Sequence, residues 1–134
     1  MDNKRAAVIT IGGDRYELIL TTKATKEIAA RYGGLENLGD KLMKNENFDM
    51  AISEIVWLIT LLANQSLLIH NIKNKEAQKP LLTEEEVELL TTPFDLAGYK
   101  AAITEALYKA LGHALKEAVM PLGEGTPLST KGVL

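Results

Sequence analysis

The chain has 134 residues, no cysteine and a formal net charge of −3 at neutral pH. This length suits one domain, and the lack of cysteine excludes disulfides, thiol nucleophiles and cysteine-based metal sites. An acidic chain lacks the basic footprint of nucleic-acid-binding proteins, which argues against nucleic acid as the main partner. Apolar residues make up 46% and aromatic residues 5%, so the core is expected to consist mainly of aliphatic side chains.

The N-terminal residues predict a β-hairpin over about residues 6–21. Val8–Ile11 and Tyr16–Leu20 are rich in β-forming residues, and Gly12-Gly13-Asp14-Arg15 lies between them. Glycine tolerates the positive φ that such turns require. Because a lone hairpin is only marginally stable in water, this one must pack on the helices or pair with another chain.

Capping residues and glycines predict two short helices after the hairpin. Thr22 is predicted to cap a helix that runs to about Tyr32, where Gly33 ends it. A second, shorter helix is predicted from Leu35 to Lys44, with apolar residues at helical spacing.

The longest predicted helix runs from Phe48 to about His70, with Asn47 as its cap. Its apolar residues cover most of its circumference, and a helix of this kind is normally buried on several sides. We therefore expect a central core helix, an oligomer contact, or both.

That helix contains the most apolar stretch of the chain, Ile55 to Ala63. The polar triplet Asn64-Gln65-Ser66 interrupts the stretch before it reaches the ~18 residues that a membrane span needs. The first residues contain no apolar run of signal-peptide length. We expect a cytoplasmic protein that is neither exported nor embedded in a membrane.

Two further helices follow a polar linker that ends at Pro80. Thr83 and Glu86 predict a capping box for a short helix through about Leu90. A last helix is expected from Thr92, as its cap, to about residue 119.

The predicted fold is thus mainly α with a short N-terminal β-hairpin (α+β). Residues 1–120 are expected to form a single compact helical domain. Residues 121–134 are rich in Gly, Pro, Ser and Thr and are expected to form a flexible tail.

No set of residues predicts catalysis. His70 and His113 show neither an HxxxH nor an HExxH spacing, and His113 with Glu117 is best explained as a surface pair. The glutamates within residues 84–88 favour a helix N-terminus, and Gly12-Gly13 lacks the GxGxxG pattern of a phosphate loop. We predict no enzyme activity, no catalytic, cofactor-binding or metal-binding residues, and no cofactor.

The candidate partner-binding residues lie on the longest helix and are Trp57, Leu58, Leu61 and Leu68. Trp57 falls at the edge of a narrow polar stripe, and the three leucines add an apolar flank. Trp57 has two open interpretations: a partly buried residue that closes the core, or an interface anchor, since tryptophan is enriched in binding hot spots.

The segment from Ile9 to Leu62 resembles the small tail assembly chaperones of long-tailed bacteriophages and prophages. That family typically shows an I-x-G-x-x-Y-x-L hairpin, a helix ending in Arg-Tyr/Phe-Gly, a Leu-x-x-Leu segment and an apolar helix. The matching residues are Ile11, Gly13, Tyr16, Leu18, Ile28, Arg31, Tyr32, Gly33, Leu35, Leu38, Ile55, Trp57, Leu58 and Leu61.

The resemblance implies a non-catalytic chaperone that coats the tape measure protein before tail tube subunits polymerise around it, and that is absent from the finished particle. It further implies that the chain forms a homo-oligomer. The implied partners are the tape measure protein and also tail tube subunits. A tape measure is a long amphipathic helix, and such a client needs an exposed apolar groove. The alternative function is a small helical regulator or adaptor protein.

Overall fold

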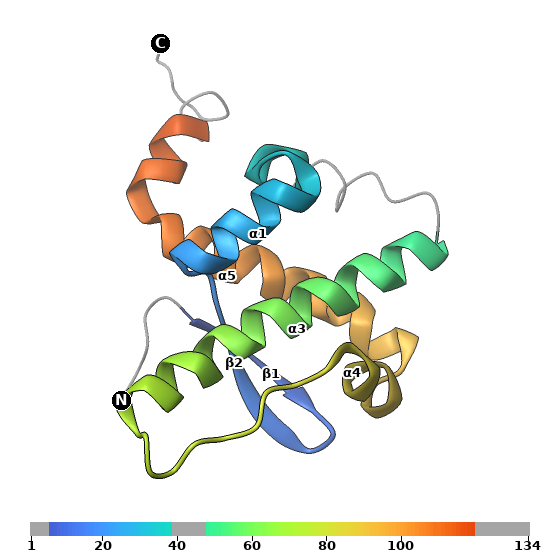
Figure 1. Ribbon diagram of the computed structural model, residues 1–134. Helices are drawn as coiled ribbons and strands as arrows, with labels where there is room; N and C mark the ends of the chain where they lie inside the picture. Colours follow the sequence, from blue (N-terminus) through green and yellow to red (C-terminus); the bar gives the residue numbers. More distant parts are fainter. Residues whose placement is uncertain (1–5, 39–47, 120–134) are drawn as a thin grey trace.

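The computed structural model describes residues 6–38 and 48–119, with side-chain surroundings for residues 6–38 and 52–110. It is mostly helical with an N-terminal two-stranded hairpin (Figure 1), which confirms the predicted fold class. Residues 35–38 are helical as well. The main elements are β1 (Ala6–Ile11), β2 (Asp14–Ile19), α1 (Thr22–Tyr32), α3 (Phe48–Lys73), α4 (Glu84–Leu90) and α5 (Pro93–Val119).

Some predictions fall outside the described residues. They are the remainder of the second helix beyond Leu38, the Asn47 cap, the side-chain pair of His113 and Glu117, and the tail over residues 121–134.

The hairpin turn is tighter than predicted. Ile11 pairs with Asp14, so the loop consists only of Gly12 and Gly13, and β2 begins two residues earlier than Tyr16. Both glycines have positive φ, 58° and 90°, which only glycine adopts readily and which matches the twist of the flanking strands.

The hairpin packs on the helices, which is one of the two predicted possibilities; the other was pairing with a second chain. Its inner face buries Ala7, Ile9 and Leu18 in the core. Two side chains of α5 also reach the outer edge of β1. Tyr99 donates its hydroxyl proton to the Thr10 carbonyl, and the Lys109 ammonium donates to the Ala6 carbonyl over 3.1 Å. These donors occupy main-chain acceptors that an edge strand otherwise leaves open.

The first helix is capped by Thr21, not by Thr22 as predicted. Thr21 is the last extended residue, and its hydroxyl accepts a hydrogen bond from the Ala24 N–H over 3.0 Å. Gly33 ends the helix in the left-handed conformation with φ of 89°, and its N–H donates to the Ala29 carbonyl. Glycine is the usual residue at such an end.

The later helix starts agree with the predictions. Thr83 and Glu86 form a complete capping box, with hydrogen bonds of 2.9 and 3.1 Å. Thr92 and Asp95 make the same reciprocal pair at the start of α5, at 2.9 and 3.3 Å. Each pair satisfies main-chain N–H groups that the helix itself cannot.

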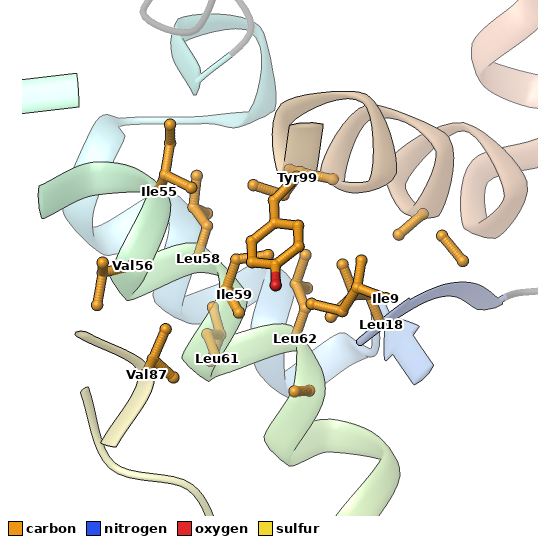
Figure 2. Packing of buried hydrophobic residues seen from close by; sticks show 14 of the residues in the cluster. Ile9, Leu18, Ile55, Val56, Leu58, Ile59, Leu61, Leu62, Val87 and Tyr99 are labelled. Carbon is orange, nitrogen blue, oxygen red and sulfur yellow. The ribbon is translucent and has the colours of Figure 1, made fainter. Parts of the chain in front are cut away.

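The core lies around α3, which contacts α1, β2, α4 and α5. Figure 2 shows side chains from the hairpin, α3, α4 and α5 directed into one shared interior. The largest fully buried side chains are Ile11, Leu18, Ile19, Ile28, Leu38, Leu58, Ile59, Leu62, Ile103, Val56 and Val87.

By length and composition alone, the Ile52–Lys73 part of α3 is apolar enough to cross a membrane. The polar triplet that was expected to interrupt it lies inside the helix. In the fold, however, the most apolar part of this segment, from Ile55 to Ala63, is buried except for the partly buried Trp57. Burial of this kind is typical of the core helix of a folded domain.

Replacing Leu62 with Ala is expected to lower the free energy of unfolding by about 2–5 kcal/mol, because it leaves a cavity beside a fully buried helix face. Urea unfolding of dilute protein measures this loss. The matched control is Leu89→Ala, at an exposed position, for which a loss of about 0.5 kcal/mol or less is expected. Equal losses in the two variants would contradict the described core.

Candidate partner-binding groove

A groove with a volume of about 250 Å³ runs along α3, and we call it the α3 groove. Its floor is α3, one wall is the first half of α1, and the other wall is the segment that leads into α4. Its lining residues are Lys23, Glu27, Trp57, Thr60, Leu61, Asn64, Gln65, Leu68, Leu81 and Glu84.

The floor follows one narrow stripe of α3. Trp57, Leu61, Asn64 and Leu68 are separated by four, three and four residues, the spacing that keeps side chains on one face of a helix. The stripe is apolar apart from Asn64. It has the spacing of a seam along which a second helix can lie.

The second wall is the linker between α3 and α4, residues 74–83. Two asparagine side chains of α3 hold it in place. The Asn64 side chain accepts from the Leu82 N–H over 2.8 Å and donates to the Leu82 carbonyl over 2.9 Å. Asn71, seven residues later on the same face of α3, makes the same two bonds to Lys79, at 2.8 and 3.0 Å. These paired bonds imitate the pairing of two strands, so they fix the linker along α3 and place Leu81 beside the groove.

The α1 wall is held at both ends. Thr21 and Gln65 share a side-chain hydrogen bond at the start of α1. At the other end the Glu54 carboxylate accepts hydrogen bonds from the Tyr32 hydroxyl and from Arg31 Nε, the latter over 3.3 Å. Both contacts keep α1 beside α3, so the wall is a fixed part of the fold.

Trp57 contacts both α1 and the groove. The Arg31 guanidinium lies 4.4 Å from the centre of its ring, within the range of a cation–π contact. The Tyr32 ring approaches edge-on at 6.0 Å with an interplanar angle of 73°, a favoured aromatic geometry. The indole is partly buried and packs against the core. Trp57 therefore contributes to the core and also lines the groove.

Burial raises the pKa of Tyr32, and the hydrogen bond to Glu54 and the charge of that carboxylate raise it further. The phenol is therefore protonated over the whole neutral range and acts as a hydrogen-bond donor to Glu54.

Three of the four predicted partner-binding residues line the groove: Trp57, Leu61 and Leu68. The prediction for Leu58 needs correction. Leu58 follows Trp57 by about 100° around the helix and points into the core, where it is fully buried. Leu61 has an exposed fraction of only 9%, whereas Leu68 is partly exposed.

Leu81 and the residues of the α1 wall were not among the predicted partner-binding residues. Leu81 sits in a polar linker, and its contact with α3 depends on the asparagine bonds described above. The seven-residue spacing of Asn64 and Asn71 on an otherwise apolar helix was the available signal.

A second cavity, of about 620 Å³, lies between the hairpin and the second half of α3. Its lining is mixed and strongly charged, with Arg15, Glu17 and Lys79 among its residues. His70 there is engaged with the Ala77 carbonyl at 3.0 Å. Within the described residues no group of three or more His, Asp or Glu side chains is placed to hold a metal ion.

The Tyr32→Phe variant tests the contact between α1 and α3. At pH 8 it is expected to be less stable than the wild type by about 1 kcal/mol, because Glu54 loses a donor. The folded-state pKa of Tyr32 is raised above its ordinary value of 10. The wild-type advantage is therefore fully present below pH 10 and is lost as pH rises beyond it. Urea unfolding of both proteins from pH 8 to pH 11 measures the difference, and a constant difference would contradict the raised pKa.

The chain matches no known family model, no curated protein and no solved structure.

Proposed function

We propose that this chain is a phage tail assembly chaperone that binds the tape measure protein and helps to recruit tail tube subunits, without catalysing a reaction. The observation that carries the proposal is the α3 groove, whose walls are fixed and whose floor combines Trp57, Leu61 and Leu68 at helical spacing with polar side chains of α3. The resemblance of Ile9–Leu62 to that family names the client.

The groove has the form that a helical client requires. From Trp57 to Leu68 the stripe rises about 16 Å along α3, which is three turns of helix. An amphipathic helix can lay its apolar face along such a stripe, as in other helix-in-groove complexes. A tape measure protein offers many such segments in succession, so one groove can serve repeated sites on one client.

The uncharged polar residues of the groove are compatible with an apolar occupant. The Thr60 hydroxyl donates to the Val56 carbonyl over 2.8 Å, and the Gln65 amide donates to the Leu61 carbonyl over 3.1 Å. Asn64 is engaged with the Leu82 main chain. Because these groups already have partners, an apolar client face can cover them without the cost of leaving buried polar groups unpaired.

The first test is a pull-down with the tagged chain from cells that carry the source phage or prophage, after induction, with mass spectrometry of the captured proteins. We expect to recover a very long, mainly helical tail protein. Leu68→Glu should reduce its recovery at least tenfold, which corresponds to about 1.4 kcal/mol of binding free energy, because it places a charge in the apolar stripe.

Ala101→Glu, at an exposed position of α5, is the matched control and should bind like the wild type. Recovery of a host regulator or nucleic acid, with the tail proteins present but unbound, would reject the proposal in favour of the adaptor function.

The single tryptophan of the chain provides a second measurement. Trp57 lines the groove, so a tryptophan-free helical peptide from the captured protein should shift its fluorescence to shorter wavelength as water is displaced. Ala101→Glu should show the same titration. Binding of the peptide with no change in Trp57 emission would place the client elsewhere.

A further inference from the structure

The two outer edges of the hairpin differ in what covers them. In the described residues the sheet consists of β1 and β2 alone. Side chains of α5 take the outward carbonyls of Ala6 and Thr10 on β1. Thr10 lies opposite Arg15, and Val8 lies opposite Glu17. A Thr10 carbonyl that points outward marks a pair without mutual hydrogen bonds, so the main-chain groups of Arg15 point outward on the other edge. Those of Glu17, two residues later, do the same.

These outward main-chain groups of β2 are open. In the described parts of the chain, no hydrogen bond reaches the main-chain N–H or carbonyl of Arg15 or Glu17. An edge strand with such groups is a template on which another extended chain can add. The fold therefore occupies acceptors on one edge of the hairpin and leaves the other edge able to pair.

The cavity of about 620 Å³ lies along this open edge. Residues 14–17 of β2 line one side of it, and α3 with the linker residues Lys79 and Pro80 lines the other. The volume falls within the ~300–1,000 Å³ of typical ligand sites. The linker does not pair with β2, because Asn71 takes the main-chain N–H and carbonyl of Lys79 and proline has no N–H. The space beside β2 is thus open to a strand that the described residues do not supply.

The walls of the cavity favour a single extended segment as the occupant. An added strand lies about 4.8 Å from β2 and brings no other element with it. A second copy of the domain would have to bring the α3 and the linker that flank its own β2 into the same space. The cavity therefore suits a lone segment of a different protein.

The side chains of Arg15 and Glu17 determine which charges such a segment needs. They are two residues apart in a strand and so share one face, and neither forms an ion pair with another described residue. The other charged residues of the cavity, Asp14 and Lys79, have opposite signs and add no net charge. Opposite charges directly across two strands stabilise their pairing, and like charges weaken it. The edge thus favours an acidic residue opposite Arg15 and a basic residue opposite Glu17.

The position between these two charges has an apolar surrounding. Tyr16 points to the other face of β2 and packs against the core. Leu67 of α3 lines the cavity and is partly exposed. A residue of the added strand that lies opposite Tyr16 is therefore expected to be apolar.

We propose that the outer edge of β2 binds an extended segment of another protein, antiparallel to β2, in which a basic, an apolar and an acidic residue follow one another. The basic residue lies opposite Glu17 and the acidic residue opposite Arg15. This strand site shares no lining residue with the α3 groove, so it does not depend on the client proposed there.

Nuclear magnetic resonance of the ¹⁵N-labelled chain tests the site with an acetylated and amidated peptide, Thr-Thr-Lys-Val-Glu-Thr-Thr. The amide signals of Arg15 and Glu17 should shift, with half-saturation below about 1 mM. Their hydrogen exchange should slow at least about tenfold when most of the protein is bound, because both N–H groups become paired. No shift of these two amides at about 1 mM peptide overturns the proposal.

Methylation of the peptide nitrogens separates strand pairing from attraction between charges. The lysine and glutamate of the peptide lie opposite Glu17 and Arg15, so their N–H groups point at β2, whereas the valine N–H points away. N-methylation of the lysine and the glutamate should abolish binding, and N-methylation of the valine should preserve it. Equal binding by the two methylated peptides contradicts a paired strand.

A charge exchange tests the order of the residues. The peptide Thr-Thr-Glu-Val-Lys-Thr-Thr has the same composition and should bind the wild type more weakly, on the order of fivefold. The variant with Arg15→Glu and Glu17→Arg should reverse this preference, with its fold checked by circular dichroism. Preference for the same peptide in both proteins, or for neither, rejects the proposed charge order.

Two further readings exclude other occupants and other places. Without peptide, the Arg15 and Glu17 amides should exchange freely at every protein concentration. Protection that grows with concentration, together with a dimer in sedimentation, would mean that a second copy closes the edge, and would overturn the proposal. The emission of Trp57 should stay unchanged during the titration, since a shift would place the peptide in the α3 groove and reject the strand site.

Discussion

The burial of α3 is the constraint on which the rest of the structure depends. This helix is apolar over most of its circumference, so a fold of this size must cover it from several directions. The hairpin, α4 and α5 do so, and their inward side chains meet those of α3 in one interior. Among the described residues, the strip from Trp57 to Leu68 is flanked by α1 and the linker. The groove is thus one part of the α3 surface that these neighbouring elements leave partly exposed.

Polar side chains of α3 hold the two walls beside that strip in place. Asn64 and Asn71 each satisfy one N–H and one carbonyl of the linker, and Glu54 holds Tyr32 and Arg31 of α1. In a mainly apolar helix such residues have few alternative partners, so they fix their neighbours with high specificity. These polar contacts hold the walls of the groove in place, although the domain has few aromatic residues.

Features that depend on local chemistry could be predicted from the sequence. The hairpin, the Thr83–Glu86 capping box and the Gly33 helix end are determined by residues within a few positions of one another. The Thr21 cap was missed by one residue because adjacent threonines offer the same hydroxyl. The orientation of α3 could not be predicted, because Leu58 and Leu68 are equally apolar and only the packing of distant elements decides that Leu58 is buried and Leu68 is partly exposed. The position of Leu81 likewise depends on the Asn64 side chain, 17 residues away in sequence.

The two hydrogen bonds from α5 to β1 have a consequence for synthesis of the chain on the ribosome. They join Tyr99 to Thr10 and Lys109 to Ala6, across 89 and 103 residues. At about 5–20 residues per second, translation needs roughly 5–20 s to supply these donors after the first strand is made. During that interval the edge of β1, and the α5-facing side of α3 once α3 has been made, lack the contacts that α5 later supplies. The nascent protein therefore passes through a stage in which it exposes more apolar surface than the finished fold, and its last helix completes the domain.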